Sequence, residues 1–102
     1  MMRWRFERRF DTLRDFLPFV LRAAEHYGCR TKVKEGGGEA SVEAESNSLK
    51  AHVRIREKTL EDHPFRRSLG PIKALDVEIE AEGEDAQNFY NRIILLSLRA
   101  FC

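Results

Sequence analysis

Residues 29–56 of the chain read CRTKVKEGGGEASVEAESNSLKAHVRIR, and apolar and polar side chains alternate through most of this stretch. A period of two is typical of half-buried β-strands. The pattern predicts three strands, at residues 29–34, 40–45 and 50–56. Residues 36–38 (three glycines) and 46–48 (Ser-Asn-Ser) supply turn-forming residues between them, so we expect the three strands to follow one another as hairpins.

The same alternation predicts one strand on each side of this stretch. Residues 2–7 and residues 75–82 both place apolar side chains at every second position. The inward positions of the five strands are Met2, Trp4 and Phe6; Cys29, Thr31 and Val33; Ala40, Val42 and Ala44; Ala51, Val53 and Ile55; and Leu75, Val77, Ile79 and Ala81. An irregular connection is expected from about Thr59 to Ile72, because it holds Pro64, Gly70 and Pro71.

Helical spacing of apolar residues predicts two helices, at residues 11–27 and 86–101. Pro18 leaves two possibilities for the first one, since proline inside a helix removes a hydrogen-bond donor. Either the regular helix starts at Asp15 as N-cap, with Pro18 harmlessly in the first turn, or a longer helix is kinked at Pro18.

The element order is therefore β-α-β-β-β-β-α, in one domain that covers residues 1–102. Every strand has a single apolar face, so the sheet needs to be covered by other elements on one side only. We predict an α+β two-layer sandwich, in which a five-stranded antiparallel sheet carries both helices on one face.

The outward faces of the strands carry charges of alternating sign, and this predicts the strand order. Unlike charges stabilise neighbouring strands and like charges destabilise them. Bases lie on the first, second and fourth strands (Arg3, Arg5; Arg30, Lys32, Lys34; Lys50, Arg54, Arg56), and acids on the third and fifth (Glu43, Glu45; Asp76, Glu78, Glu80, Glu82). Strands two to five then alternate in sign as a meander, and the basic first strand fits beside the acidic fifth. The predicted order is 1-5-4-3-2.

Composition narrows the functional classes. The chain has 102 residues, 42% hydrophobic and 34% charged, with a net charge of +1, so it forms a globular core without a general attraction to polyanions. No stretch is long and apolar enough for a membrane span, and the first residues do not resemble a secretory signal. Cys29 and Cys102 do not make a disulfide scaffold, so we expect a cytoplasmic protein. Cys29 is predicted in the core and Cys102 as an exposed thiol, with a bridge between them left open.

The chain has 13 Arg against 5 Lys, and few Asn and Gln residues. This composition suits a thermophile, although a GC-rich genome produces the same arginine bias.

We find no catalytic or metal-binding motif in the sequence. His26, His52 and His63 are scattered, and no partner stands at metal-ligand spacing. The glycines at 36–38 are flanked by Glu35 and Glu39 and are not followed by a helix, unlike a phosphate-binding loop. The sequence therefore predicts no enzyme, no cofactor and no metal.

This element order resembles the TATA-box-binding-protein-like group of folds, whose unit is a strand, a helix, four strands and a helix. Small archaeal proteins of about this length resemble it too. The resemblance covers most of the chain by element order, without a matching signature residue. The aromatic wedges with which the TATA-box binder kinks DNA have no counterpart, because Trp4 and Phe6 fall on the predicted core face. The resemblance implies the two-layer fold and permits a nucleic-acid hypothesis.

Three functions are compatible with these observations. The first is a non-enzymatic module that binds DNA or RNA through basic residues, namely Arg30, Lys32, Lys34, Arg54, Arg56, Arg66, Arg67 and Lys73. The second is a protein-interaction subunit or homodimer that uses Ile94, Leu95 and Leu98, which lie around the side of the last helix away from its main apolar face. The third is a small-ligand carrier with space beside Ala40, Ala44 and Ala51, although closer packing explains these small residues equally well.

Overall fold

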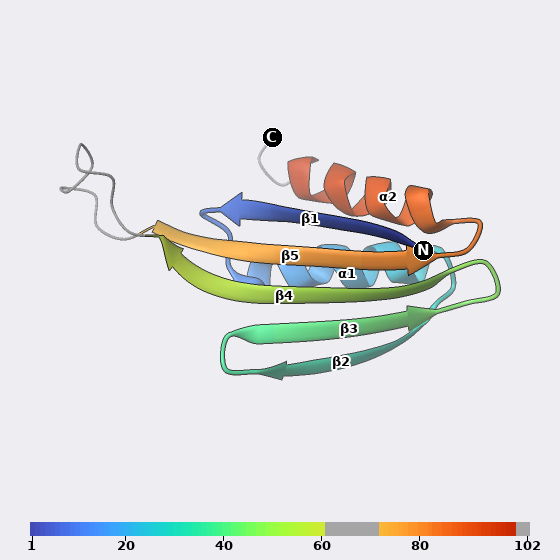
Figure 1. Cartoon of the computed structure of the whole chain (residues 1–102), viewed down its shortest axis with the longest axis horizontal. Helices are drawn as coiled ribbons and strands as arrows, with labels where there is room; N and C mark the ends of the chain where they lie inside the picture. Colours follow the sequence, from blue (N-terminus) through green and yellow to red (C-terminus); the bar gives the residue numbers. More distant parts are fainter. Residues whose placement is uncertain (61–71, 100–102) are drawn as a thin grey trace.

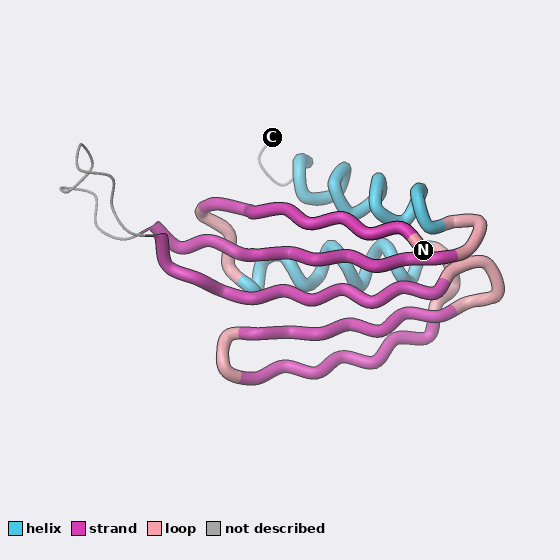
Figure 2. Tube along the Cα trace, viewed as in Figure 1, coloured by secondary structure: helices cyan, strands magenta, loops and turns pink. Residues whose placement is uncertain are grey.

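The computed structural model describes residues 1–60 and 72–99, which form a long sheet and two helices (Figures 1 and 2). The elements are β1 (Met2–Arg9), α1 (Leu13–His26), β2 (Arg30–Gly36), β3 (Glu39–Glu45), β4 (Lys50–Leu60), β5 (Ile72–Glu82) and α2 (Ala86–Arg99). All strand pairs are antiparallel, in the order β1-β5-β4-β3-β2. The predicted fold class and strand order are confirmed.

The outer face of the sheet follows the predicted charge rule at most cross-strand positions. Glu78 of β5 lies between Arg5 of β1 and Arg54 of β4, for example. One pair breaks the rule, since Glu7 lies opposite Asp76. Lys58 of β4 compensates, because its Nζ lies 2.6 Å from Glu7 Oε2 and 2.8 Å from Asp76 Oδ1.

Lys58 is available because β4 and β5 are longer than the sequence pattern indicated. The ladder between them continues to Leu60 and Ile72, so the irregular connection does not include Thr59, which pairs with Lys73. β1 likewise extends to Arg9. Beyond the core, the inward positions of a strand no longer need apolar side chains, so the sequence alternation ends there. The backbone hydrogen bonds between the strands continue further. Pro64, Gly70 and Pro71 lie outside the described residues.

Helix α1 starts before Asp15, which was the N-cap in the first of the two predicted arrangements. Thr12 is the N-cap, with extended backbone, and its Oγ1 accepts a hydrogen bond of 3.3 Å from the N–H of Asp15. The expectation of Asp15 as N-cap is wrong, and the longer helix forms with Pro18 inside it. Pro18 is exposed, and its missing N–H removes one hydrogen bond of the helix.

Both helices cover the same face of the sheet. The ring of Phe6 meets Phe16 of α1 and Tyr90 of α2 edge-on, each at 6.2 Å between centroids, and Trp4 stacks on Tyr90 at 4.5 Å. The two helices also contact each other. The fully buried side chains of this layer include Phe16, Val20, Val42, Val53, Val77, Ile79, Phe89 and Ile93. Ala40, Ala44 and Ala51 are at most 5% exposed within this core, so close packing accounts for their size.

Strand β2 is the exception to the predicted inward pattern. Thr31 and Val33 lie on the helix side of the sheet, but all of β2 is exposed and Val33 is 40% accessible. Helix α1 contacts β2, β3 and β4, but it leaves every residue of β2 exposed, and Cys29 just before β2 is half-buried. Burial raises the pKa of the Cys29 thiol, which is free. Cys102 lies outside the described residues.

Candidate binding surfaces

The basic residues predicted to bind nucleic acid fall on more than one surface. Arg30, Lys32 and Lys34 of β2 and Arg54 and Arg56 of β4 are exposed on the outer face of the sheet, since each pairs in register with an outward residue of β3.

Lys73 lies in the β5 row that continues through Leu75, so it belongs to the helix side. The structure therefore separates Lys73 from the other described bases. Arg66 and Arg67 lie outside the described residues.

The predicted bases of β4, Arg54 and Arg56, lie opposite carboxylates of β5, and Arg56 also lies opposite one of β3. Arg56 lies between Glu39 and Asp76, and its Nε is 3.2 Å from Glu39 Oε1. Arg54 has Glu78 on one side and Ser41 on the other. Such pairs lower the positive potential that a phosphate backbone would meet.

The bases of β2 form no ion pairs in the described ranges. Arg30 lies opposite Glu45, Lys32 opposite Glu43 and Lys34 opposite Ser41, and none of the three has a carboxylate of a described residue within 4 Å. Arg5, Lys50 and Arg54 on the other strands also lack such an ion pair with the described residues, so β2 differs in being the strand at the edge of the sheet.

The outer face is hollowed at the end near residues 46–48. A groove of about 1000 Å³ is lined by both signs of charge across four neighbouring strands, through Lys32, Glu43, His52 and Glu80. The ring of His52 shares a 2.7 Å hydrogen bond between its Nε2 and Ser41 Oγ. Sequence reasoning missed this contact, because it depends on the register of β3 and β4.

The Ser41–His52 pair lacks the surroundings of a catalytic dyad. In the part of the chain that the structure describes, no carboxylate hydrogen bonds to His52, and residues that could hold a metal ion do not cluster. β3 and β4 are both interior strands, so their backbone N–H groups are used in the sheet and cannot form an oxyanion hole. The groove offers polar and charged side chains of both signs for contact.

The second surface is the exposed face of α2. Leu95 is 55% and Leu98 is 53% exposed, and Ile94 is half-buried beside them. Ala86, Phe89, Ile93 and Ser97 are buried on the opposite side of the helix. Of the three predicted interface residues, the two leucines are thus placed where a partner would meet them.

The fully exposed residues of this face are uncharged, and half-buried Arg92 lies at its border. Its other exposed residues are Gln87, Asn88 and Asn91, and the Gln87 amide donates to Asn91 Oδ1 at 3.1 Å. The whole chain has only one Gln and three Asn, so most of its amide side chains gather here. In a chain with 34% charged residues, a surface of amides and leucines differs from the rest. Charged residues are depleted at the centre of protein interfaces.

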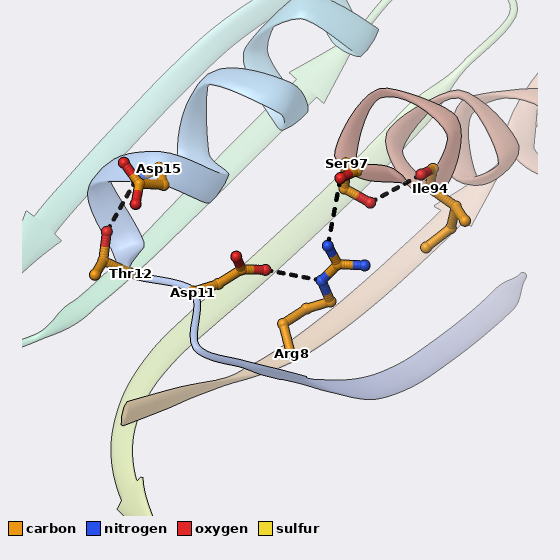
Figure 3. A network of polar contacts seen from close by, with 6 residues as sticks. All are labelled: Arg8, Asp11, Thr12, Asp15, Ile94 and Ser97. Atoms are coloured by element: carbon orange, nitrogen blue, oxygen red, sulfur yellow. Dashed lines mark hydrogen bonds and ion pairs between the residues drawn. The ribbon is translucent and has the colours of Figure 1, made fainter. Parts of the chain in front are cut away.

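Arg8 holds the end of α2 that carries this face (Figure 3). It continues the inward row of β1 after Phe6, and its Nη2 reaches the main-chain carbonyl of Ser97 at 3.5 Å. Carbonyls in the last turn of a helix lack intrahelical partners and attract cations. Arg8 thereby fixes the turn on which Leu95 and Leu98 are presented.

No helix within residues 1–60 and 72–99 is long and apolar enough to cross a membrane. Comparisons of the chain with family models, curated proteins and solved structures find no match.

Proposed function

We propose that this protein is a non-enzymatic binding module that associates with a second copy of itself through the exposed face of α2. The observation that carries the proposal is the pair of exposed leucines, whose fully exposed neighbours between residues 86 and 98 are amides and whose nearest charge is half-buried Arg92. Exposed apolar strips bounded by polar groups mark association surfaces.

A second copy is a better occupant of this face than an unlike partner. In a two-fold interface the same residues meet each other, so a charged face repels itself whereas an uncharged face does not. Two α2 helices crossing at Leu95 would bring leucine against leucine, with Asn88 and Asn91 at the border. Elsewhere the sheet presents charged edges that lack this self-complementarity.

The size of α2 predicts a weak dimer. Its 14 residues span about 21 Å, and a helix is about 10 Å wide, so the contact buries no more than about 500 Å² per partner. A standard stable interface buries about 800 Å² per partner. An interface of this size is typical of weak or transient association.

Variants of matched exposed apolar residues test this proposal. Leu95→Glu places a charge at the centre of the face and should give monomers by light scattering at 200 µM. Val33→Glu is the control, since Val33 is also exposed but lies at the far edge of the sheet. The Val33 variant should keep the dimer. Dimers that survive Leu95→Glu would contradict the proposal.

Nucleic-acid binding is the second candidate. The exposed bases Arg30, Lys32 and Lys34 favour it, because they form no ion pair within the described residues. Arg54 lies one strand further, across Ser41, so a short row of the outer face has no carboxylate. The resemblance of the element order to the TATA-box-binding-protein-like folds supports the same candidate. Arg56, Arg66, Arg67 and Lys73 stay in it as predictions.

A salt series of fluorescence anisotropy with duplex DNA, duplex RNA and a single strand tests this candidate. Phosphate contacts give an affinity that falls linearly with salt on logarithmic axes. The double variant Lys34→Glu, Arg54→Glu should then make the affinity depend less steeply on the salt concentration. Absence of binding at about 50 mM salt, where such contacts are strongest, would exclude it.

The protein is further proposed to act in the cytoplasm. The free thiol of Cys29 supports this location, because reducing compartments keep thiols unpaired.

A further inference from the structure

The outer edge of β2 is an open edge of the described sheet, at the side away from β1. The strand order of the described residues ends at β2, so one side of its backbone has no strand partner there. An unpaired sheet edge presents N–H and C=O groups that an extended segment can bind.

The turn between β2 and β3 shows which backbone groups point outward. Gly36 pairs with Glu39 across Gly37 and Gly38, whose φ values of 59° and 77° fit a two-residue hairpin turn. In such a hairpin the residues that flank the turn exchange hydrogen bonds, and every second pair after them does so too. Arg30, Lys32, Lys34 and Gly36 therefore bond to β3, whereas the backbone groups of Thr31, Val33 and Glu35 face the open edge.

Side chains lie closer in a pair that does not exchange backbone hydrogen bonds. Two of the outer-face ion pairs form at close cross-strand positions of this kind, although Arg5 with Glu78 and Lys50 with Glu45 occupy such positions without an ion pair within 4 Å. The bond from Phe10 N–H to the Lys73 carbonyl fixes the phase of the β1–β5 ladder, and it makes Arg3 and Glu80 such a close pair. Their ion pair measures 2.6 Å.

The bond from Glu57 N–H to the Gly38 carbonyl fixes the phase between β3 and β4 in the same way. Glu39 and Arg56 are then a close pair, and they form an ion pair of 3.2 Å.

Lys32 and Lys34 stand in the opposite situation. On the β3 side, Lys32 and Lys34 belong to pairs that exchange backbone hydrogen bonds, in which the two side chains lie further apart. Neither lysine forms an ion pair in the described part of the chain. On the side of the open edge, Lys32 and Lys34 would belong to pairs without backbone hydrogen bonds, in which the side chains of the two strands lie closer together. A sixth strand on this edge would thus meet these lysines at the cross-strand spacing of the Arg3–Glu80 and Glu39–Arg56 ion pairs.

We propose that the β2 edge binds an extended acidic segment of another protein as a sixth strand. Its carboxylates, two residues apart, would pair with Lys32 and Lys34 on the outer face, and an apolar side chain between them would cover Val33 on the helix side. This continues the alternation of charge by which the sheet is built, from basic β4 to acidic β3 to basic β2.

A second copy of this chain is a poor occupant of the same edge. Antiparallel pairing of two β2 strands about Val33 would place Lys32 opposite Lys34 of the other copy, and like charges directly opposite are destabilising. The free edge of β1 is also basic on the outer face, at Arg3, Arg5 and Arg9. Pairing of β1 with β2 therefore brings bases together as well.

Titration of the ¹⁵N-labelled protein with a capped peptide tests the proposal. The probe is LDVEIEAE, the sequence of residues 75–82, which has the required alternation of apolar and acidic side chains. The control is the same peptide with lysine at its four acidic positions. We expect the acidic peptide to slow amide exchange at Thr31, Val33 and Glu35 at least tenfold, and the lysine peptide to have no effect.

Two variants separate strand addition from simple attraction of charges. Lys32→Glu together with Lys34→Glu should lose affinity for the acidic peptide at least tenfold and gain it for the lysine peptide. Val33→Pro removes an N–H that faces the open edge and leaves the hydrogen bonds between β2 and β3 in place. It should therefore lower the affinity for the acidic peptide by a similar factor. A single-stranded DNA octamer serves as the competing polyanion.

Three results would overturn the proposal. One is equal binding of the acidic and lysine peptides by the unmodified protein, which needs no variant to fold. Another is binding of the acidic peptide without protection of Thr31, Val33 and Glu35. The third is binding of the DNA octamer that depends on Lys32 and Lys34 but is unchanged by Val33→Pro, since this marks a polyanion site. Loss of the α2 dimer in Leu95→Glu leaves the edge intact, so the two proposals fail separately.

Discussion

Arg8 Nε donates a hydrogen bond of 2.8 Å to Asp11 Oδ2, and both side chains are largely buried. The same guanidinium lies over the ring of Phe16, with its carbon 5.9 Å from the centroid. It also reaches the Ser97 carbonyl in the last turn of α2. One arginine at the end of β1 thus connects the start of α1 with the end of α2.

Removing the carboxylate of Asp11 should therefore be costly. Asp11→Ala removes a 2.8 Å charged hydrogen bond to Arg8 in a largely buried position, and we expect a loss of about 2 kcal/mol in the free energy of unfolding. Asp15→Ala is the control, because Asp15 is exposed in the first turn of α1 and should cost only about 0.5 kcal/mol. Urea unfolding measures both, and equal losses would show that the buried contact adds nothing.

Gly83 is expected to tolerate no side chain. Its φ is +108°, and a Cβ there would lie 2.5 Å from the Ser48 carbonyl oxygen. Gly83→Ala should cost about 3 kcal/mol or more, through backbone strain and a clash with main-chain atoms.

Gly28→Ala is the matched control for this glycine. Its φ of +69° gives strain of about 1 to 2 kcal/mol, but nothing lies within 4 Å of its Cβ position. Thermal unfolding should rank the two variants clearly. A loss for Gly83→Ala as small as that for Gly28→Ala would mean that the approach of residues 48 and 83 is looser than described.

Lys58 should give stability that depends on pH at both extremes. Hydrogen bonds from Lys58 and Arg9 lower the pKa of Glu7 below its usual 4.5, and bonds to Asp76 and Glu7 raise the pKa of Lys58 above 10.5. The contribution of Glu7 is complete above pH 4.5 and is lost as the pH falls through its lowered pKa. That of Lys58 is complete below pH 10.5 and is lost as the pH rises through its raised pKa.

Lys58→Met should therefore move the pKa of Glu7 upward, towards 4.5, in an NMR titration of its carboxyl group. Lys50→Met changes the same charge at the other end of β4 and should leave the pKa of Glu7 unchanged. The stability difference between Lys58→Met and the unmodified protein should disappear in strong acid. A pKa of Glu7 that is the same in both variants would contradict this assignment.

The strand order could be predicted because the sheet is charged on one face and apolar on the other. The apolar alternation located the strands, and the sign of the outward residues located their neighbours, since Arg54 fits only beside a neutral or acidic strand. Arg8 and Lys58 were missed for a related reason. Each continues a strand beyond the part that the alternation marks, so its partners depend on the register.

The exposure of β2 could not be predicted from alternation. Val33 has the same sequence context as Val42 and Val53, which are fully buried in neighbouring strands. Only the position of α1 over β3 and β4 decides which of the three is covered. The start of α1 was misjudged because the N-cap role of Thr12 depends on its own backbone geometry.

The candidate surfaces were predictable in unequal degree. The helical positions of Leu95 and Leu98 already put them opposite the buried face, and the structure finds them exposed. The set of basic residues was less predictable, because Lys73 lies on the helix side and the neighbours of Arg56 compensate its charge. The backbone edge of β2 carries no signal in the composition at all.

The central claim is that α2 carries a self-association surface, and sedimentation of the unmodified chain tests it most directly. We predict a mass of 11.9 kDa at low concentration that rises towards twice this value between about 1 and 200 µM. The rise should persist in high salt, because Leu95 and Leu98 carry no charge. A mass that stays at 11.9 kDa over the whole range, or a dimer that dissociates in high salt, would contradict the account.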